Sequence, residues 1–406
     1  MRITLVSPYD FAVPGGVNEH VRNLALGLRA GGHEVHTLAP ASERVIDHPD
    51  FHSLGHPIKI PVNDSVARVT FRLRLRTSTY RLLERSEVIH FHEPLLPSTP
   101  LSLLGHSRAA NVGTFHAYAD RSLGYRLGRR LLVRYLRRLD ATIAVSEPAS
   151  DFLRQYFPEA DPLLIPNGVD TAFFRPDAES PERLRRTGTT ILFVGRLEKR
   201  KGVLELVRAF AAVAQARPGS RLVLVGDGPL RRPVEAEIRR LRLAGVSLEG
   251  QVPRALLPSY YAGADLFCAP SLAAESFGIV LLEAMASGLP VVASSVAGYA
   301  ALVEAETEAL LVAPGDTDRL SAALLRAAAD DDLRRRLARA GLAKAELHSW
   351  AAVIPRVEGV YARALQVRGR REGSRAARRP WASADPTAEP AQGQRDQALQ
   401  LLADEQ

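Results

Sequence analysis

The sequence predicts a two-domain α/β protein built on two parallel sheets. Short runs of β-branched residues alternate with longer segments of helical period, and this alternation is typical of parallel strands covered by helices on both faces. The alternation occurs twice along the 406 residues, and a polar stretch with two prolines, residues 175–188, separates the two parts. We therefore expect two doubly wound domains facing a central cleft, with ligands beyond the carboxyl ends of the strands.

The first domain is predicted over residues 1–172. Its first strand is expected at residues 3–6, and the helix that follows has an apolar face and ends at a glycine pair, residues 31–32. That face contains Val17, Val21, Leu24 and Leu28. Further strands are predicted at residues 34–38, 88–91, 112–115 and 142–145.

The second domain is predicted over residues 173–350. Its strands are expected at residues 191–194, 221–225, 265–269, 291–294 and 310–312. A helix over residues 351–367 is expected to return to the first domain and complete it. Residues 368–406 begin with a basic block and continue with Ala, Pro, Gln and Asp, so we predict a disordered tail.

The composition excludes a disulfide framework. Cys268 is the one cysteine in the sequence, which fits a reducing cytoplasm. We expect neither a signal peptide nor a membrane span, because no charged leader and no run of about 18 apolar residues occurs. The net charge of +8 fits either an arginine-rich proteome or attraction to an anionic lipid or nucleic acid.

A glycine pair, Gly15 and Gly16, lies between the first strand and its helix. Glycines let the backbone approach a phosphate closely, and a helix N-terminus favours negative charge. The same pair also suits an ordinary structural turn. By itself, therefore, this motif leaves both a phosphate contact and a purely structural role open.

The segment 195–202 is a basic loop between two glycines, directly after the first strand of the second domain. Its position places Arg196 and Lys201 at the carboxyl end of a strand, where ligands of parallel sheets bind. Two fixed cations there can hold a diphosphate and neutralise the charge that grows as a sugar leaves. A solvated charge run is the alternative, and the position favours function.

Two acidic residues, Glu275 and Glu283, are spaced a little over two helical turns apart. Glu275 is expected in a loop and Glu283 inside the following helix. Residues 276–279 would begin that helix, with free backbone amides directed at a ligand. Carboxylates accept paired sugar hydroxyls, so Glu275 suits a hexose and Glu283 a ribose.

Histidines gather near two of the predicted strands. His90 and His92 lie on either side of Phe91, and His116 follows another strand. No cysteine or HExxH pattern accompanies them, so we predict no metal site.

Two arginine-rich segments alternate with apolar residues. The first contains Arg72, Arg74, Arg76 and Arg81, which we predict to meet an anionic membrane, and the second covers residues 126–138. Basic amphipathic segments lie on anionic bilayers, although a solvated helix face gives the same pattern.

The glycine pair, the Arg-x4-Lys pair and the Glu-x7-Glu segment, taken in order, resemble glycosyltransferase family 4 over roughly residues 1–367. The resemblance is strongest to the branch that mannosylates phosphatidyl-myo-inositol. Segments 7–9, 13–17, 60–61, 65–68 and 90–94 carry it, together with Asn63.

This resemblance implies a GT-B fold, with two Rossmann-like domains, and a retaining transfer of a hexose. The expected donor is GDP-mannose, and the expected acceptor is phosphatidyl-myo-inositol on the inner face of the cell membrane, where the protein would be peripheral. No cofactor is expected to bind tightly, with Mg²⁺ at most accompanying the nucleotide sugar.

The resemblance also implies residue roles. His116, Arg196, Lys201 and Glu275 would act at the reacting centre. The donor would be bound by Gly15, Gly16, Arg196, Lys201, Val252, Glu275, Ser276, Phe277, Gly278, Ile279 and Glu283. The acceptor would be bordered by Tyr9, Asn18, Asn63 and Arg68.

Three other interpretations remain open at this point. One is a family 4 enzyme with another donor or another lipid acceptor, such as diacylglycerol. A nucleotide-sugar epimerase shares the two-domain fold and has no need of a basic membrane face. A nucleic-acid binder is suggested by charge alone, and we expect no nucleic acid because no recognisable motif or aromatic stacking array accompanies the arginines.

Overall fold

The computed structural model describes residues 1–13, 15–45, 48, 50–62, 65–71, 75–119, 121–180, 188–273 and 275–377. Residues up to Leu365 form one compact unit, and a second unit begins at Gln366. Among the described residues, no helix combines the length and the apolar character that crossing a bilayer requires.

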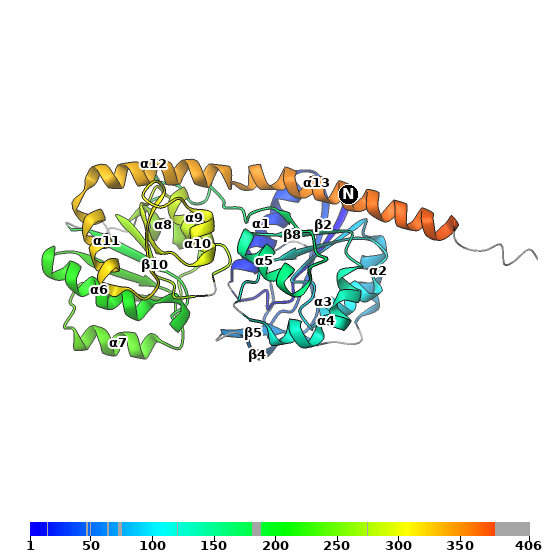
Figure 1. Cartoon of the computed structure of the whole chain (residues 1–406), viewed down its shortest axis with the longest axis horizontal. Coiled ribbons are helices and arrows are strands. Elements are labelled where there is room, and N and C mark those ends of the chain that lie inside the picture. Colours follow the sequence, from blue (N-terminus) through cyan, green and yellow to red (C-terminus); the bar gives the residue numbers. More distant parts are fainter. Residues whose placement is uncertain are drawn as a thin grey trace, which may run out of the picture. The chain divides into compact units, whose positions relative to one another are not determined.

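The first sheet has seven parallel strands in the order β3-β2-β1-β6-β7-β8-β9. Figure 1 labels β2 and β8 of this sheet. The five strands predicted for this half are confirmed within two residues at each end. The short strands β3 and β9 were not predicted, and neither was the separate antiparallel hairpin β4–β5. The bounds are β1 Arg2–Val6, β2 Glu34–Ala39, β3 Phe51–Ser53, β4 Ile58–Val62, β5 Ser65–Val69, β6 Val88–His92, β7 Ala110–Phe115, β8 Ala141–Ala144 and β9 Leu163–Leu164.

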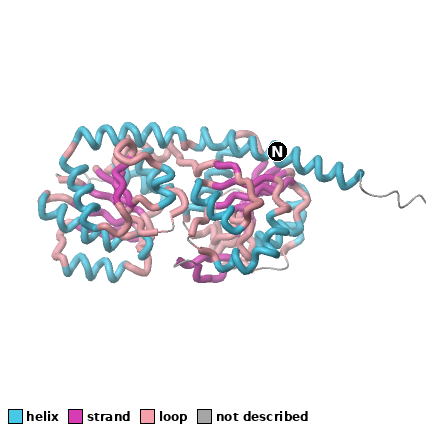
Figure 2. The backbone as a smooth tube through the Cα atoms, viewed as in Figure 1, coloured by secondary structure: helices cyan, strands magenta, loops and turns pink. Residues whose placement is uncertain are grey.

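Helices cover both faces of this sheet (Figure 2). One face packs against α1 and the first part of α13, and the other packs against α2 to α5. Alternate residues of each strand point to opposite faces, which is why Leu5 and Val6 belong to different cores. The helix bounds are α1 Gly16–Ala30, α2 Thr77–Arg85, α3 Thr99–His106, α4 Leu123–Leu136, α5 Glu147–Tyr156 and α13 Trp350–Ala377.

The second sheet has six parallel strands in the order β12-β11-β10-β13-β14-β15. All five predicted strands are confirmed, and β12 is an edge strand that the sequence did not reveal. The bounds are β10 Thr190–Val194, β11 Arg221–Val225, β12 Val246–Gly250, β13 Leu266–Ala269, β14 Val291–Ser294 and β15 Ala309–Val312.

This sheet is also covered on both faces. Side chains of α6, α7, α11 and the start of α12 pack on one face, and those of α8, α9 and α10 pack on the other. The predicted class, two doubly wound parallel-sheet domains, is therefore confirmed. The bounds are η2 Lys199–Lys201, α6 Val203–Ala216, α7 Arg231–Arg240, η3 Arg254–Leu256, α8 Leu257–Ala262, α9 Ile279–Ala286, α10 Ala297–Leu302, α11 Thr317–Ala329 and α12 Asp331–Leu347.

The helix expected at residues 351–367 is the first part of α13. It supplies Val353, Val357 and Tyr361 to the core of the first sheet, so it packs where we expected. The expectation of disorder from residue 368 was wrong for residues 368–377, which continue the helix. Arg, Glu and Ala favour helix without any apolar period, and they dominate this stretch.

Two of these expectations lie outside the described residues in part. The tail beyond residue 377 does so, as do residues 181–187 of the expected linker. The domain boundary near residue 172 stays a prediction.

Candidate active site

The basic loop after β10 is shaped by glycine. η2 makes a single turn and ends at Gly202, whose φ of +65° lies in the left-handed region. A Cβ at this position would collide with the carbonyl oxygen of Pro270. The basic loop is also hydrogen-bonded to the segment after β13, because the Leu272 N–H donates to the Arg200 carbonyl at 2.7 Å. The cations of this loop are therefore presented on a fixed backbone.

Glu275 lies between two cations of that loop. Its Oε1 is 2.7 Å from Lys201 Nζ and 2.7 Å from Arg200 Nη1. The structure thus brings together two predicted residues, Glu275 and Lys201. Arg200 was missed, and its place beside Lys201 in the same basic loop was the available signal.

Arg196 turns to a different carboxylate. Its guanidinium is 2.6 Å from Glu198 Oε1, and Glu198 Oε2 is 3.3 Å from Arg200 Nε. Glu198 is buried, whereas half of the Arg196 side chain is exposed. Three cations and two carboxylates, Arg196, Glu198, Arg200, Glu275 and Lys201, therefore form one continuous chain of ion pairs, which we call the loop charge chain.

The segment after Glu275 approaches the first domain. α9 begins at Ile279, later than expected, because Gly278 has a φ of +122° that does not belong to a helix. Gly298 N–H donates to the Glu275 carbonyl at 3.0 Å, and any side chain at Gly298 would collide with this segment. Among the described residues, the N–H groups of Ser276 and Phe277 donate to no backbone carbonyl, as a donor site requires.

Glu283 is held inside α9 by a phenol. Tyr261 Oη donates to Glu283 Oε2 at 2.8 Å, a partner that the sequence did not suggest. Burial raises the pKa of this carboxyl to about 7. Glu283 is thus positioned and still has one oxygen for another partner. Val252, expected near the base of the nucleotide, packs against the core of the second sheet.

The glycine pair lies beside α9. Gly15 has a φ of −176°, which any residue adopts, and no described atom would lie within 4 Å of a Cβ there. A Cβ at Gly16 would be 3.4 Å from Ile279 Cδ1. Further contacts between the halves are the ion pair of Arg254 with Glu19 at 2.6 Å and the hydrogen bond from Ser146 Oγ to the Ser276 carbonyl at 2.5 Å.

His116 belongs to a buried cluster of histidines. His92 Nδ1 and His116 Nε2 are 3.0 Å apart, and the His20 ring lies 4.9 Å from that of His116. His20 comes from α1 and was not predicted. Burial lowers the pKa of His20 to about 4 and lowers that of His92 and His116 well below the usual range. These imidazoles are therefore neutral at physiological pH.

Three of these rings offer possible metal ligands. One atom each from His20, His92 and His116 lies within 4.8 Å of the others. Zinc–nitrogen bonds of about 2.0–2.1 Å need a tighter set, and the bond between His92 and His116 competes with a metal. The absence of a metal stays a prediction.

Glu93 fixes the backbone at His116. Its Oε1 accepts from the N–H groups of His116 and Ala117 at 2.5 and 2.7 Å. Its own φ is +50°, which is uncommon for a residue with a side chain. Burial raises the pKa of the Glu93 carboxyl to about 7. No hydrogen bond or ion pair of the described residues joins His116 to Lys201 or Glu275.

The residues expected at the acceptor gather around Asp10. Asn18 is buried, and its Nδ2 donates to the carbonyls of Asp10 and Val13 at 2.8 and 3.0 Å. Arg68 lies 3.6 Å from the buried Asp10 carboxylate, and Tyr9 pairs with Val69. Asn18 therefore has a structural task in the loop after β1, while Asn63 lies outside the described residues.

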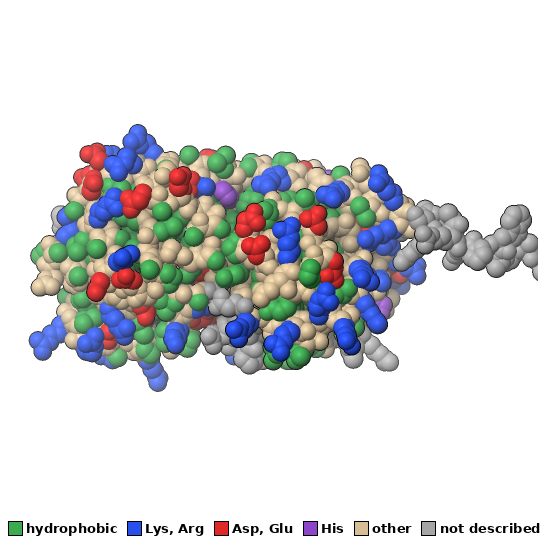
Figure 3. All heavy atoms as spheres, viewed as in Figure 1, with side chains coloured by type: hydrophobic (Ala, Val, Ile, Leu, Met, Phe, Trp, Pro, Cys, Tyr) green, Lys and Arg blue, Asp and Glu red, His purple; other side chains and the backbone are tan. Residues whose placement is uncertain are grey.

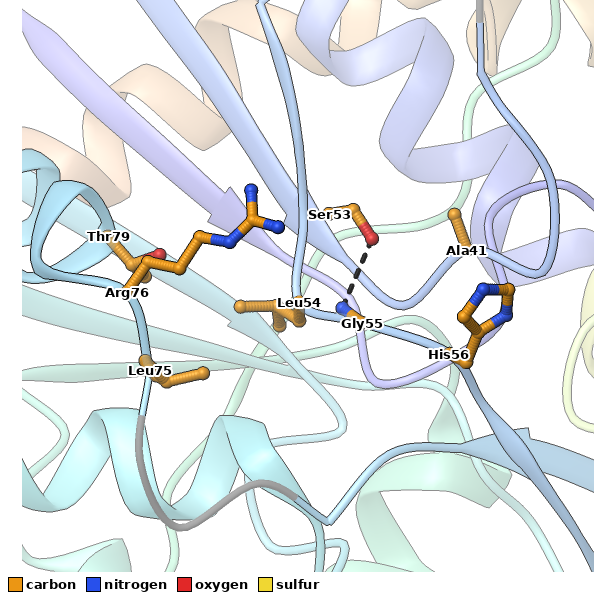
Figure 4. A pocket seen from close by; sticks show the side chains of 8 residues that line it. All are labelled: Ala41, Ser53, Leu54, Gly55, His56, Leu75, Arg76 and Thr79. Carbon is orange, nitrogen blue, oxygen red and sulfur yellow. Dashed lines mark hydrogen bonds between the residues drawn. The ribbon is translucent and has the colours of Figure 1, made fainter.

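The four arginines predicted to meet a membrane lie in different surroundings. Arg76 lines a cavity of about 260 Å³ with His56, Ser53 and Thr79 (Figure 4). Arg81 is exposed on α2, and Arg72 and Arg74 lie outside the described residues.

Two family models match the chain. The model described as Glycosyltransferase Family 4 matches residues 14–173, and the one described as Glycosyl transferases group 1 matches residues 175–344. A phosphatidyl-myo-inositol mannosyltransferase of Mycolicibacterium smegmatis is 38% identical over 375 residues, covering 89% of this chain and 93% of that protein. The chain belongs to glycosyltransferase family 4. The transferase interpretation therefore replaces that of an epimerase.

Solved structures agree with this glycosyltransferase fold. Sucrose-phosphate synthase from Thermosynechococcus elongatus has a TM-score of 0.70 at 25% identity, covering 89% of this chain and 98% of that one. Anabaena HepE in complex with UDP has a TM-score of 0.69 at 20% identity, covering 89% and 100%, and is similar in fold. The predicted GT-B architecture is thereby confirmed for this glycosyltransferase.

Proposed function

We propose that this glycosyltransferase moves mannose from GDP-mannose onto phosphatidyl-myo-inositol, with retention of anomeric configuration. The observation that carries the proposal is the 38% identity to a phosphatidyl-myo-inositol mannosyltransferase over 93% of its length. Relatives with the same name from Mycobacterium leprae, Mycobacterium tuberculosis and Propionibacterium freudenreichii are 36%, 36% and 32% identical.

The loop charge chain would hold the donor. Lys201 and Arg196 would bind the diphosphate, with Arg200 as a third cation within the same turn. Fixed cations stabilise the negative charge that develops on the diphosphate as the bond to the sugar breaks. Mg²⁺ is not needed as a resident ion in this scheme, and would at most arrive with the donor.

The remaining donor contacts follow the order of the chain. Gly15, Gly16 and the backbone of residues 276–279 would approach the phosphates and the sugar. Glu275 would exchange a cation for sugar hydroxyls, and Glu283 would accept from the ribose while Tyr261 holds it in place. His116, neutral and fixed by Glu93, would line the reacting centre.

The acceptor would enter beside the loop after β1, bordered by Tyr9, Arg68 and Asn63. The leaving phosphate would take the proton of the inositol hydroxyl, so no protein base is required. Because the acceptor is a lipid, the protein would work as a peripheral protein on the inner face of the cell membrane, with Arg72, Arg74, Arg76 and Arg81 predicted to meet anionic lipid.

The test is a donor and acceptor screen. The purified protein is incubated with GDP-mannose or UDP-glucose, together with phosphatidyl-myo-inositol or diacylglycerol in detergent. Mass spectrometry should find one added hexose with GDP-mannose and phosphatidyl-myo-inositol alone, and NMR should give the α-anomer. A product from diacylglycerol or from UDP-glucose instead would contradict the proposal.

A further inference from the structure

The outward face of α4 has an unusual combination of side chains for a soluble surface. Leu123, Leu127 and Leu131 are 66%, 74% and 54% exposed. Their spacing of four residues places them in one row along the helix. Exposed leucines are common singly, but a row of three on one face marks an interaction surface.

Arginines lie beside this row. Arg126, Arg130 and Arg134 repeat with the same spacing of four and are exposed. The helix contains no Asp or Glu, and among the described residues no ion pair holds any of these three arginines. The outward face of α4 is thus half apolar and half cationic, and we call it the Leu–Arg face.

The opposite side of α4 anchors it firmly. Tyr125, Leu132 and Leu136 are buried, and the Tyr125 ring contacts Phe152 and Phe157 with centroids 5.8 and 5.3 Å away. Ser122 caps the N-terminus by accepting from Tyr125 N–H at 3.2 Å. The core therefore packs against the buried side of α4 alone, and the Leu–Arg face lies on the outside of the domain.

The surrounding surface has the same charge. Figure 3 shows Lys and Arg side chains gathered at the lower right, over the region where Figure 1 labels α4, with hydrophobic side chains among them. A protein partner of this face would need an acidic rim around an apolar centre. An anionic bilayer offers both at once, because phosphates lie directly above acyl chains.

The geometry points to the Leu–Arg face as the surface by which this protein docks on an anionic lipid bilayer. This inference rests on the proposed function, since it assigns the place where a lipid-modifying enzyme meets its membrane. It also separates α4 from α2, whose described outward side chains include Arg81, Glu84 and Arg85 and no large exposed apolar residue. Arginines of α2 can attract lipid, whereas those of α4 have leucines beside them to insert.

The test uses two triple variants of the full chain. One replaces the leucines (Leu123→Ser, Leu127→Ser, Leu131→Ser) and the other the arginines (Arg126→Ser, Arg130→Ser, Arg134→Ser). Binding is titrated with vesicles of phosphatidylcholine alone and of equal parts phosphatidylcholine and phosphatidylglycerol. An arginine near an anionic surface is worth roughly a factor of five in affinity, so the arginine variant should lose roughly a hundredfold.

Matched controls remove the same residue types elsewhere. Leu256→Ser with Leu347→Ser removes two exposed leucines, and Arg319→Ser with Arg326→Ser and Arg335→Ser removes three exposed arginines of the second domain. These controls should bind the anionic vesicles as the parent chain does. Circular dichroism and thermal unfolding confirm that each variant is folded.

The expected pattern is binding of the parent to anionic vesicles alone, weakened by salt, and loss in both α4 variants. Both should still glycosylate acceptor dispersed in detergent. Equal vesicle binding by the leucine variant and the parent would overturn the inference, as would a change of oligomeric state in ultracentrifugation with vesicle binding unchanged. Failure of the parent to transfer sugar in detergent would contradict the proposed function and leave the vesicle result standing.

Discussion

At the scale of single residues, Glu275 has two partners that give it a second task. It was predicted to accept sugar hydroxyls, and in the structure it neutralises Lys201 and Arg200 at 2.7 Å each. The sequence pattern identifies Glu275 and Lys201 because loops at strand ends hold ligands. It does not identify Tyr261 or His20, because their partners are distant in sequence. Glu198 contacts its near neighbours Arg196 and Arg200, and this pairing depends on how the loop folds.

Changing Glu275→Gln should lower turnover at least tenfold without weakening the binding of GDP. The amide keeps the shape but no longer neutralises the two cations, which then remain available to the diphosphate. Lys201→Ala should instead weaken the binding of GDP, because a charge-assisted hydrogen bond to phosphate contributes about 1.5–3 kcal/mol. Calorimetry with GDP and kinetics with saturating donor separate the two. Near-normal turnover in both variants would remove these residues from the site.

Glu93 gives a prediction of pH dependence. Its pKa is raised from 4.5 to about 7, so between these pH values the unfolded chain releases a proton that the folded chain keeps. Stability contributed by Glu93 is therefore present below about pH 4.5 and declines as pH rises towards 7, by about 3 kcal/mol in all. Glu93→Gln keeps the acceptor oxygen and removes this dependence.

The measurement is urea unfolding of the parent and of Glu93→Gln at pH 4.5 and pH 8. Relative to the parent, the variant should gain stability as pH rises. Glu283 and the buried histidines titrate equally in both proteins, so they cancel in the difference. If the difference in stability between the two proteins is the same at both pH values, the pKa of Glu93 is not raised in the folded chain. Glu93→Ala should be less stable than Glu93→Gln at every pH, because the N–H groups of His116 and Ala117 lose their acceptor.

At the scale of elements, the sequence predicts what is long and periodic. All ten predicted strands exist, since buried strands of a parallel sheet are continuous apolar runs. β3, β9 and β12 lie at sheet edges and bury less, so their composition is weaker evidence. The predicted start of α9 was wrong because Gly278 adopts a φ of +122°. Glycine can adopt this backbone conformation, but its presence in a sequence does not predict it.

The turn at Gly202 should be the least tolerant position of the basic loop, residues 195–202. Gly202→Ala combines a left-handed φ with a collision against the Pro270 carbonyl, so η2 must move and carry Lys201 with it. We expect lower stability and at least tenfold weaker GDP binding. Gly15→Ala is the contrasting variant, because its φ is extended and its surroundings are open. It should fold normally, and any loss of turnover would report on the donor itself.

At the scale of the whole molecule, the chain passes between its two sheets twice. Val169 N–H donates to the His348 carbonyl at 2.8 Å, and Trp350 N–H donates to the Val169 carbonyl at 3.2 Å. The two passages therefore lie side by side. The sequence indicates the return of the last helix through its apolar period, but not this pairing, which depends on residues 180 positions apart.

Gly168 makes that pairing possible. A Cβ there would be 2.5 Å from Trp350 Cδ2, so Gly168→Ala should destabilise the chain by about 1–3 kcal/mol through overpacking. Gly359→Ala is the control, since nothing in the described part of the chain, apart from the adjacent backbone of its own helix, would lie within 4 Å of the added methyl group. Thermal unfolding should show a lower Tm for the first variant alone, with partial recovery on adding Trp350→Leu. An unchanged Tm for Gly168→Ala would show that the indole moves freely.

The loop charge chain has a consequence for how the donor enters. The three cations and two carboxylates of this chain sum to one positive charge, and each cation already has a carboxylate beside it. Under the proposed function, donor binding would be an exchange of anions, in which phosphate would displace Glu275 and free it for the sugar. Such an exchange releases few bulk ions, so ionic strength should affect donor affinity much less than membrane attachment. The enzyme would therefore still bind the nucleotide at a salt concentration that releases it from the bilayer.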